Sequence, residues 1–293
     1  MSLFTPTTGN GTITFGVMMQ NPLALTQPIR NLVERQSITT KFFRQHPGPI
    51  QGGAIQFNKV NLAEITVADD VEERSPGAEY RVTRPVDPDT RVAPVKDWGC
   101  SVLIYEEELR RGQQDYLQRV MQQATNTLVK QIDLAAMTAL NVATTDEQIE
   151  GHDWSQLMFV GPADSLTPSA ERPTADISFA QLAADLQQLD VAHDTLVVNP
   201  QEAHHLRTAY GPDLTGALAS AGITDMTVNR LVEPGTAWTT QAGEAGYIGF
   251  EEAITVRAVE HANRRTLELV CYVVPAFAVS NPAATKLLTG LAG

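Results

Sequence analysis

The feature that most constrains the fold is an amphipathic period in the middle of this 293-residue chain. From residue 113 to residue 142, apolar side chains recur at steps of three and four, which places them on one face of a single helix. At a rise of about 1.5 Å per residue, about 30 residues span roughly 45 Å, which is long for a globular protein. We expect this helix to support the other elements. Its apolar face consists of Tyr116, Leu117, Val120, Met121, Ala124, Leu128, Ile132, Ala135, Ala136, Ala139 and Leu140.

The residues before this helix predict a long β-ribbon. Apolar and polar side chains alternate in Ala54–Val60 and in parts of 80–86 and 92–104. Between these runs, residues 69–77 are a polar turn with a Pro-Gly pair. Folded back, the runs form a two-stranded ribbon with a charged tip. Because an isolated ribbon is only marginally stable in water, we expect it to rest on a neighbour.

The N-terminal segment differs from the rest of the chain. Residues 1–28 contain no charged residue and show neither a helical nor a strand period. Such a segment cannot bury a face of its own, so it is either a disordered tail or an extended arm, and we favour the arm. Residues 29–44 predict a short helix or turn.

The residues after the long helix predict alternating helices and strands, and hence the α+β class. Ser178 is the expected N-cap of a helix over 178–189, and Asn199 and Pro200 begin another that Gly211 ends. We expect strands at 157–160, 195–198, 223–233, 245–250, 253–260 and 266–279, with a hairpin turn at 260–265.

Charge and cysteine content exclude several classes of protein. The chain has 21 basic and 34 acidic residues, which disfavours tight, sequence-independent binding to nucleic acid and a basic membrane surface. The longest apolar run, Leu269–Val279, is too short for the ~20 residues that a spanning helix needs. Cys100 and Cys271 make no disulfide framework or four-ligand zinc site, and we interpret them as reduced core thiols.

No motif predicts catalysis. The sequence lacks a phosphate-binding Gly-rich loop, a dinucleotide fingerprint and a nucleophile elbow. His204 and His205 are adjacent and cannot ligate one metal as an i, i+4 pair could. His152-Asp153 and His193-Asp194 pair an acid with an imidazole, but no nucleophile is marked nearby. We therefore expect no enzyme activity and no catalytic, cofactor-binding or metal-binding residues.

The order of these features resembles the HK97-fold major capsid proteins of tailed double-stranded DNA bacteriophages. The resemblance rests on the ribbon Gly53–Ile104 (the family's E-loop), the helix ending at residues 130–140 (its spine helix) and Leu196–Glu202 (the start of its axial domain). Residues 267–282 are similar to the closing strand of its peripheral domain. The resemblance implies an arm at 1–45, the E-loop ribbon at 46–104, and the spine helix with the first part of the peripheral domain at 105–145. It further implies a mainly axial domain at 146–250 and C-terminal peripheral-domain strands at 251–293.

The family resemblance also implies a function. Hexamers and pentamers of the chain would close into an icosahedral phage head around double-stranded DNA, which an acidic chain contacts weakly and without specificity. The further implied partners are a separate scaffolding protein (or none), a portal and decoration proteins, with no membrane. The implied location is the virion, assembled in the bacterial host cytoplasm. Two alternatives are an encapsulin-type nanocompartment shell, against which the uncharged arm argues, and an unrecognised α+β enzyme.

The charged tip of the ribbon is the predicted assembly contact. Asp69, Asp70, Glu72 and Glu73 gather four acids within five positions, with Arg74 beside them. A charged turn is most often simply solvated, but in a shell the same small contact recurs in every subunit. The predicted partners are Arg110 and Arg111, near the start of a neighbour's long helix.

Overall fold

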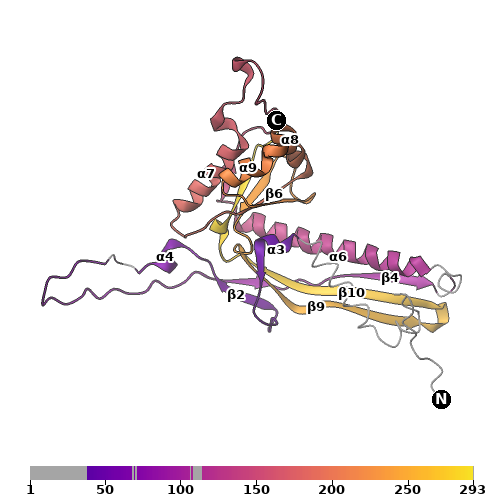
Figure 1. Ribbon diagram of the computed structural model, residues 1–293. Coiled ribbons are helices and arrows are strands. Elements are labelled where there is room, and N and C mark those ends of the chain that lie inside the picture. The colour runs from indigo at the N-terminus through magenta and orange to yellow at the C-terminus, as the bar shows by residue number, and fades with distance from the viewer. Residues whose placement is uncertain (1–37, 68, 70, 106, 108–113, 293) are drawn as a thin grey trace.

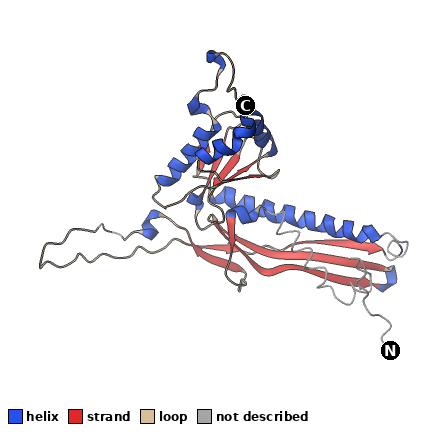
Figure 2. Ribbon diagram, viewed as in Figure 1, coloured by secondary structure: helices blue, strands red, loops and turns tan. Residues whose placement is uncertain are grey.

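The computed structural model describes residues 38–292 except 68, 70, 106 and 108–113. A long sheet lies under the helix α6 (Gln114–Ala143), a smaller unit with α7 (Pro173–Asp185) stands on it, and a long loop extends to one side (Figure 1). Helices and strands occur in both units (Figure 2), which confirms the α+β class. The predicted arm spans residues 1–45. Its residues 1–37 lie outside the described part of the chain.

The long sheet has four strands in the order β1-β9-β10-β4. The strand β10 (Thr266–Ala278) pairs antiparallel with both β9 (Gly246–His261) and β4 (Trp98–Tyr105), and β1 (Phe43–Gln45) runs parallel to β9. A short 3-10 turn, Ala262–Arg264, joins β9 to β10, which confirms the predicted hairpin. The strands expected at 245–250 and 253–260 form one continuous strand, β9. The register of its pairing with β10 shifts around Val274 and Pro275.

The helix α6 covers one face of this sheet, as its sequence period predicts. Val120, Leu128 and Ile132 are buried against Leu267 and Leu269 of β10. Burying each such side chain contributes about 1.5–3 kcal/mol, so the amphipathic face accounts for the position of the helix. The 30 residues of α6 confirm the single long helix expected over 113–142.

The second unit is built on a five-stranded sheet in the order β5-β11-β8-β6-β7. Its core contains Trp154, Ile177, Leu196 and Leu206. The strands are β5 (Gln148–Glu150), β11 (Thr285–Thr289), β8 (Ala237–Thr240), β6 (Thr195–Val198) and β7 (Asp225–Val228), and the helices are α7, α8 (Pro200–Tyr210) and α9 (Leu214–Ser220).

The predicted ends of α8 are confirmed. The Asn199 side chain accepts a hydrogen bond from the Gln201 backbone N–H at 2.9 Å, Pro200 opens the helix, and Gly211 follows its last residue. These are the residues that favour helix ends, so local sequence decided both boundaries.

The two units share a core where the described chain begins. Phe42, at the end of α3 (Thr39–Phe42), meets the ring of Trp238 edge-on at 5.9 Å. Met137 and Leu140 of α6 belong to the same buried cluster. The C-terminal half of α6 therefore packs against the second unit as well as the long sheet.

The predicted ribbon is paired only at its base. The strands β2 (Ala54–Asn58) and β3 (Thr90–Pro94) pair antiparallel, whereas residues 59–89 contain no strand among those described and one short helix, α4 (Leu62–Ile65). The prediction of a strand at 80–86 is therefore wrong. Pro85 has no backbone N–H to donate to a neighbouring strand, and this stretch pairs with no described strand. The run 92–104 divides between β3 and β4, which belong to different sheets.

Two other local predictions are wrong. Residues 157–160 form no strand. The helix expected to start at Ser178 is α7, which starts at Pro173 after Arg172, because proline is well suited to a first helical position. The sequence predicted none of the short strands β5, β8 and β11. After the turn at Pro282–Ala284, β11 pairs with β5 and β8 in the second sheet rather than with β10.

Candidate assembly surfaces

The loop of residues 59–89 projects from the body of the molecule (Figure 1). Its two ends are held together by the β2–β3 pair and by the Lys59 backbone N–H, which donates to the Asp89 carbonyl at 3.0 Å. Val71 and Val82 are 94% and 91% exposed, and Ile65 and Tyr80 are also exposed. Apolar side chains in such an extended segment have no cover from the described part of the chain, which is typical of a surface that contacts another molecule.

The charged tip is organised within the loop. Arg81 binds Asp69 at 3.0 Å and Glu72 at 2.8 Å, and so joins the outgoing and returning segments of the loop. Arg74, which the sequence places beside the acids, instead donates to the Ala78 carbonyl at 2.7 Å and stacks on Tyr80. These pairs are exposed, and exposed pairs contribute only about 0–1 kcal/mol each.

Of the other predicted contact residues, the structure describes only Glu73. Glu73 lies on the loop and is exposed. Asp70, Arg110 and Arg111 lie outside the described residues, so their pairing stays a prediction. The role of Arg81 was missed from the sequence, because it lies 9 and 12 positions from the two acids that it binds.

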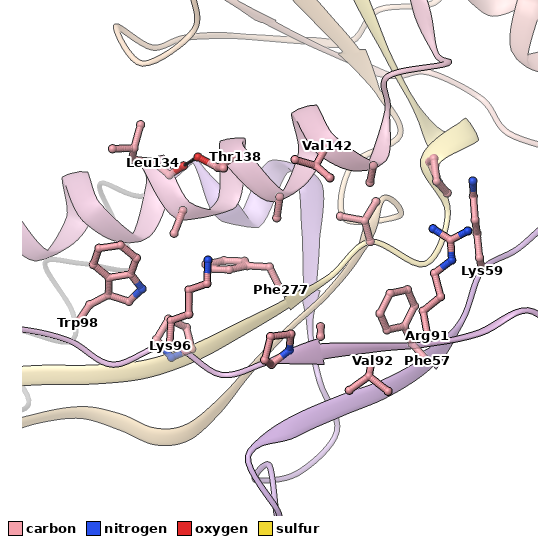
Figure 3. Close-up of a pocket in the computed structure, with 18 residues that line it drawn as sticks. Phe57, Lys59, Arg91, Val92, Lys96, Trp98, Leu134, Thr138, Val142 and Phe277 are labelled. Atoms are coloured by element: carbon pink, nitrogen blue, oxygen red, sulfur yellow. Dashed lines mark hydrogen bonds between the residues drawn. The ribbon is translucent and has the colours of Figure 1, made fainter.

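A groove of about 480 Å³ lies between the base of the loop and the C-terminal half of α6 (Figure 3). Phe57 and Val92 of the loop base, Phe277 of β10, and Leu134 and Val142 of α6 line it with apolar surface. Leu134 and Val142 are exposed to solvent on the helix. The groove is therefore an apolar surface that the described residues leave uncovered.

The rim of this groove is basic. Lys59, Arg91 and Lys96 line it, and no acidic residue does among the described residues. Arg91 is paired with Asp89 at 3.0 Å, whereas neither lysine forms an ion pair within the described part of the chain. The indole N–H of Trp98, also on the lining, has no hydrogen-bond partner there. An acidic segment with apolar neighbours complements such a groove.

Asp133 fastens the start of the described chain to α6. Its buried carboxylate accepts hydrogen bonds from the Thr39 hydroxyl at 2.9 Å and from the Ile38 backbone N–H at 3.4 Å. Buried carboxylates need such partners.

The histidines are part of no candidate metal site among the described residues. His152 pairs with Asp176 at 2.6 Å, and Asp176 also accepts from the Trp154 indole at 2.8 Å. This buried carboxylate fixes the 151–154 segment on α7. The described chain contains no group of three or more metal-ligating side chains, and none of its helices has the length and apolar character that a bilayer crossing requires.

Solved structures with the same fold come from viruses and virus-like particles. A structure from Mycobacterium phage Adephagia aligns with a TM-score of 0.62 at 15% identity, over 86% of this chain and 89% of that one. The capsid structure of the cyanophage P-SCSP1u gives 0.62 at 16% identity, over 88% and 89%. A virus-like particle from Pyrococcus furiosus gives 0.59 at 13% identity, over 91% and 98%.

The sequence itself also matches a family model. No curated protein matches the chain. The model described as phage capsid protein matches residues 88–287, which include α6, both sheets' central strands and most of the second unit. This agrees with the HK97-fold resemblance of the sequence. The chain therefore belongs to the phage capsid protein family.

Proposed function

We propose that copies of this chain form hexamers and pentamers of an icosahedral phage head that encloses double-stranded DNA. The observation that supports it best is the projecting loop, whose valines Val71 and Val82 are left exposed by the described part of the chain. A neighbouring subunit would cover them and recover apolar burial at about 25 cal/mol per Å². The family match supports the same role.

We propose further that the loop tip of one subunit lies in the groove of the next. The tip presents Glu73 and Val71, and the groove presents Lys59 and Lys96 around an apolar floor. Apolar contact would supply most of the affinity, and the opposite charges would set register and orientation. Arg110 and Arg111 remain proposed partners of the same tip.

The proposal includes the surroundings of the shell. The chain's net charge of −13 suits an inner surface that encloses DNA without binding it tightly. A portal, decoration proteins and a separate scaffolding protein are the further partners proposed, with assembly in the host cytoplasm and residence in the virion. The chain has a structural role and no catalytic one in this proposal.

A nanocompartment shell of the encapsulin type is the second candidate. The likeness to the virus-like particle from Pyrococcus furiosus favours it, because that structure covers 91% of this chain. The two candidates differ in what the shell contains. Particles from cells that express the other phage structural and packaging genes should enclose DNA, whereas a nanocompartment would enclose protein cargo.

The test is assembly of the full chain with and without its loop. Sedimentation and electron microscopy should show capsomers or closed shells for the parent chain, expressed alone or with its scaffolding protein. In the matched variant, Asn-Gly replaces residues 60–88 and connects β2 to β3 with a two-residue turn. The turn fits because the Lys59 backbone N–H already donates to the Asp89 carbonyl. This variant should fold but not assemble. A parent chain that stays monomeric, with its loop protected from protease, would contradict the proposal.

A further inference from the structure

The two cysteines of the chain lie directly opposite each other on neighbouring strands. Cys100 is on β4 and Cys271 is on β10, and they are register partners in the antiparallel pair. Cα atoms of directly opposed residues in such a pair are about 4.5–5.5 Å apart, within the range of about 4.4–6.8 Å that disulfides span. Nothing in the sequence spacing of these cysteines indicates this meeting.

Both side chains are on the sheet face that α6 covers. Cys271 is 2% exposed and belongs to the buried core cluster there, and Cys100 packs against the same cluster while remaining partly exposed. The strand β4 is the edge strand of the described sheet, so a reagent can approach Cys100 from the unpaired side of β4. One thiol is therefore accessible to a reagent, and the other is held beside it in the core.

The two thiols are chemically different. A hydrogen bond from the Cys271 thiol stabilises the Cys100 thiolate and lowers the pKa of Cys100 to about 7, against the opposing effect of burial. The same bond, together with burial, raises the pKa of Cys271. At neutral pH Cys100 is therefore the nucleophile and Cys271 keeps its proton.

We propose that Cys100 and Cys271 form an intrachain disulfide when the protein meets a small disulfide such as oxidised glutathione. The Cys100 thiolate attacks one glutathione sulfur and breaks the glutathione disulfide, and one glutathione leaves. Cys271 then attacks the Cys100 sulfur and expels the second glutathione, which takes the Cys271 proton. Two cysteine thiols are oxidised to one disulfide, and the oxidant is reduced to two glutathione thiols.

The bond would fasten the edge strand to the centre of the sheet. β4 follows β3 at the base of the projecting loop and precedes α6, and it pairs only with β10 in the described sheet. A cross-link between β4 and β10 closes a long chain loop, the case in which a disulfide constrains the unfolded state most. The role of this disulfide rests on the proposed function. A shell released from a reducing cell into an oxidising medium would gain the bond on release.

The experiment uses the reduced full-length chain, treated with oxidised glutathione, then denatured and alkylated for intact-mass analysis. The parent chain should lose both alkylatable thiols without gaining glutathione, and a peptide linking Cys100 to Cys271 should appear. The Cys271→Ala variant should stop at a single glutathione adduct on Cys100. The Cys100→Ser variant should keep an unmodified Cys271. The melting temperature of the parent should rise by roughly 5–15 °C on oxidation, and those of the variants should not.

Three results would overturn the proposal. The parent chain would stop at a glutathione adduct with Cys271 still alkylatable, or keep both thiols, or form disulfide-linked dimers on a non-reducing gel. The parent chain alone decides, so a variant that fails to fold does not obscure the result. Because the bond is measured by mass and assembly by sedimentation, either proposal can fail without the other.

Discussion

The ammonium group of Lys286, a residue only 1% exposed, contacts the carboxylate of Glu147. Glu147 follows α6 and directly precedes β5, whereas Lys286 is on β11, nearly at the C-terminus. The Gln187 side chain donates to the same carboxylate at 2.9 Å. This buried pair therefore joins three segments of the second unit that are far apart in sequence.

Removing the acid should be worse than removing the base. The Glu147→Gln variant leaves a buried Lys286 without its counter-charge, which typically costs about 3–5 kcal/mol. The Lys286→Met variant should cost less, because Glu147 is partly exposed and keeps Gln187. Thermal unfolding followed by circular dichroism measures both.

The double variant Glu147→Gln with Lys286→Met completes the cycle. We expect it to be more stable than Glu147→Gln alone, since the unpaired buried charge is gone. If the two single changes simply add, the ion pair contributes nothing to the stability of the second unit.

His193 should make stability depend on pH. Burial lowers the pKa of His193 from 6.5 to about 4; the positive charge of Lys286 adds to this, and contacts with Ala283, Asp185 and Asp194 only partly oppose it. Between pH 6.5 and 4 the unfolded chain therefore binds a proton that the folded chain does not. Stability should fall by up to roughly 3 kcal/mol as pH drops through this window, and this contribution should level off below it.

The His193→Leu variant is the control for this pH effect. It keeps an apolar volume at the site but has no group to protonate, so its melting temperature should decline less between pH 6.5 and 4. Other carboxylates titrate in both proteins, and the difference between the two curves isolates His193. Identical curves would show that His193 does not contribute.

The shell should contain no covalent links between subunits at the loop tip. An amide bond there needs an amine, and residues 69–84 include three arginines and no lysine. Arginine cannot be deprotonated to act as a nucleophile in a protein. Lys59 and Lys96 lie at the base of the loop, where they line the groove. Particles boiled in reducing denaturing gels should therefore run as 31.8 kDa chains, and a ladder of multiples would contradict this.

Local signals predicted the long helix and the ends of α8 well. The period of α6 repeats over 30 residues, and Asn199, Pro200 and Gly211 each favour their position for a reason internal to the chain. Such elements are decided by neighbours in sequence. The hairpin at 260–265 belongs to the same kind, because its turn lies between two long strands.

Pairings between distant segments were not predictable. β5 and β8 are three and four residues long, which is too short to show a strand period in the sequence. β5 pairs with β11, and most of the sequence of the second unit lies between these two strands. The pairing of His152 with Asp176 of α7 likewise joins two residues that are 24 positions apart in the sequence. Only the folded chain brings these residues together, so a single sequence holds no signal for them.

Reversing the charge of the loop tip should block shell closure without unfolding the subunit. In the Glu72→Lys, Glu73→Lys variant, positive tips would face the lysines of the groove, and the effect should be stronger at low salt, where screening is weaker. Circular dichroism should be unchanged, and particle yield by sedimentation should fall at two salt concentrations. Glu73→Lys alone is the matched variant, because it leaves the Arg81 pairs with Asp69 and Glu72 intact.

The partner of the tip can be identified by restoring opposite charges. Adding Lys59→Glu and Lys96→Glu to the double tip variant should recover particle yield if the groove receives the tip, because each subunit then meets its neighbour with the signs exchanged. Recovery by changes at Arg110 and Arg111 instead would assign the contact to the start of the neighbour's long helix. Normal particle yield of the double tip variant at both salt concentrations would mean that the tip is only a solvated turn, since its exposed pairs contribute about 0–1 kcal/mol each.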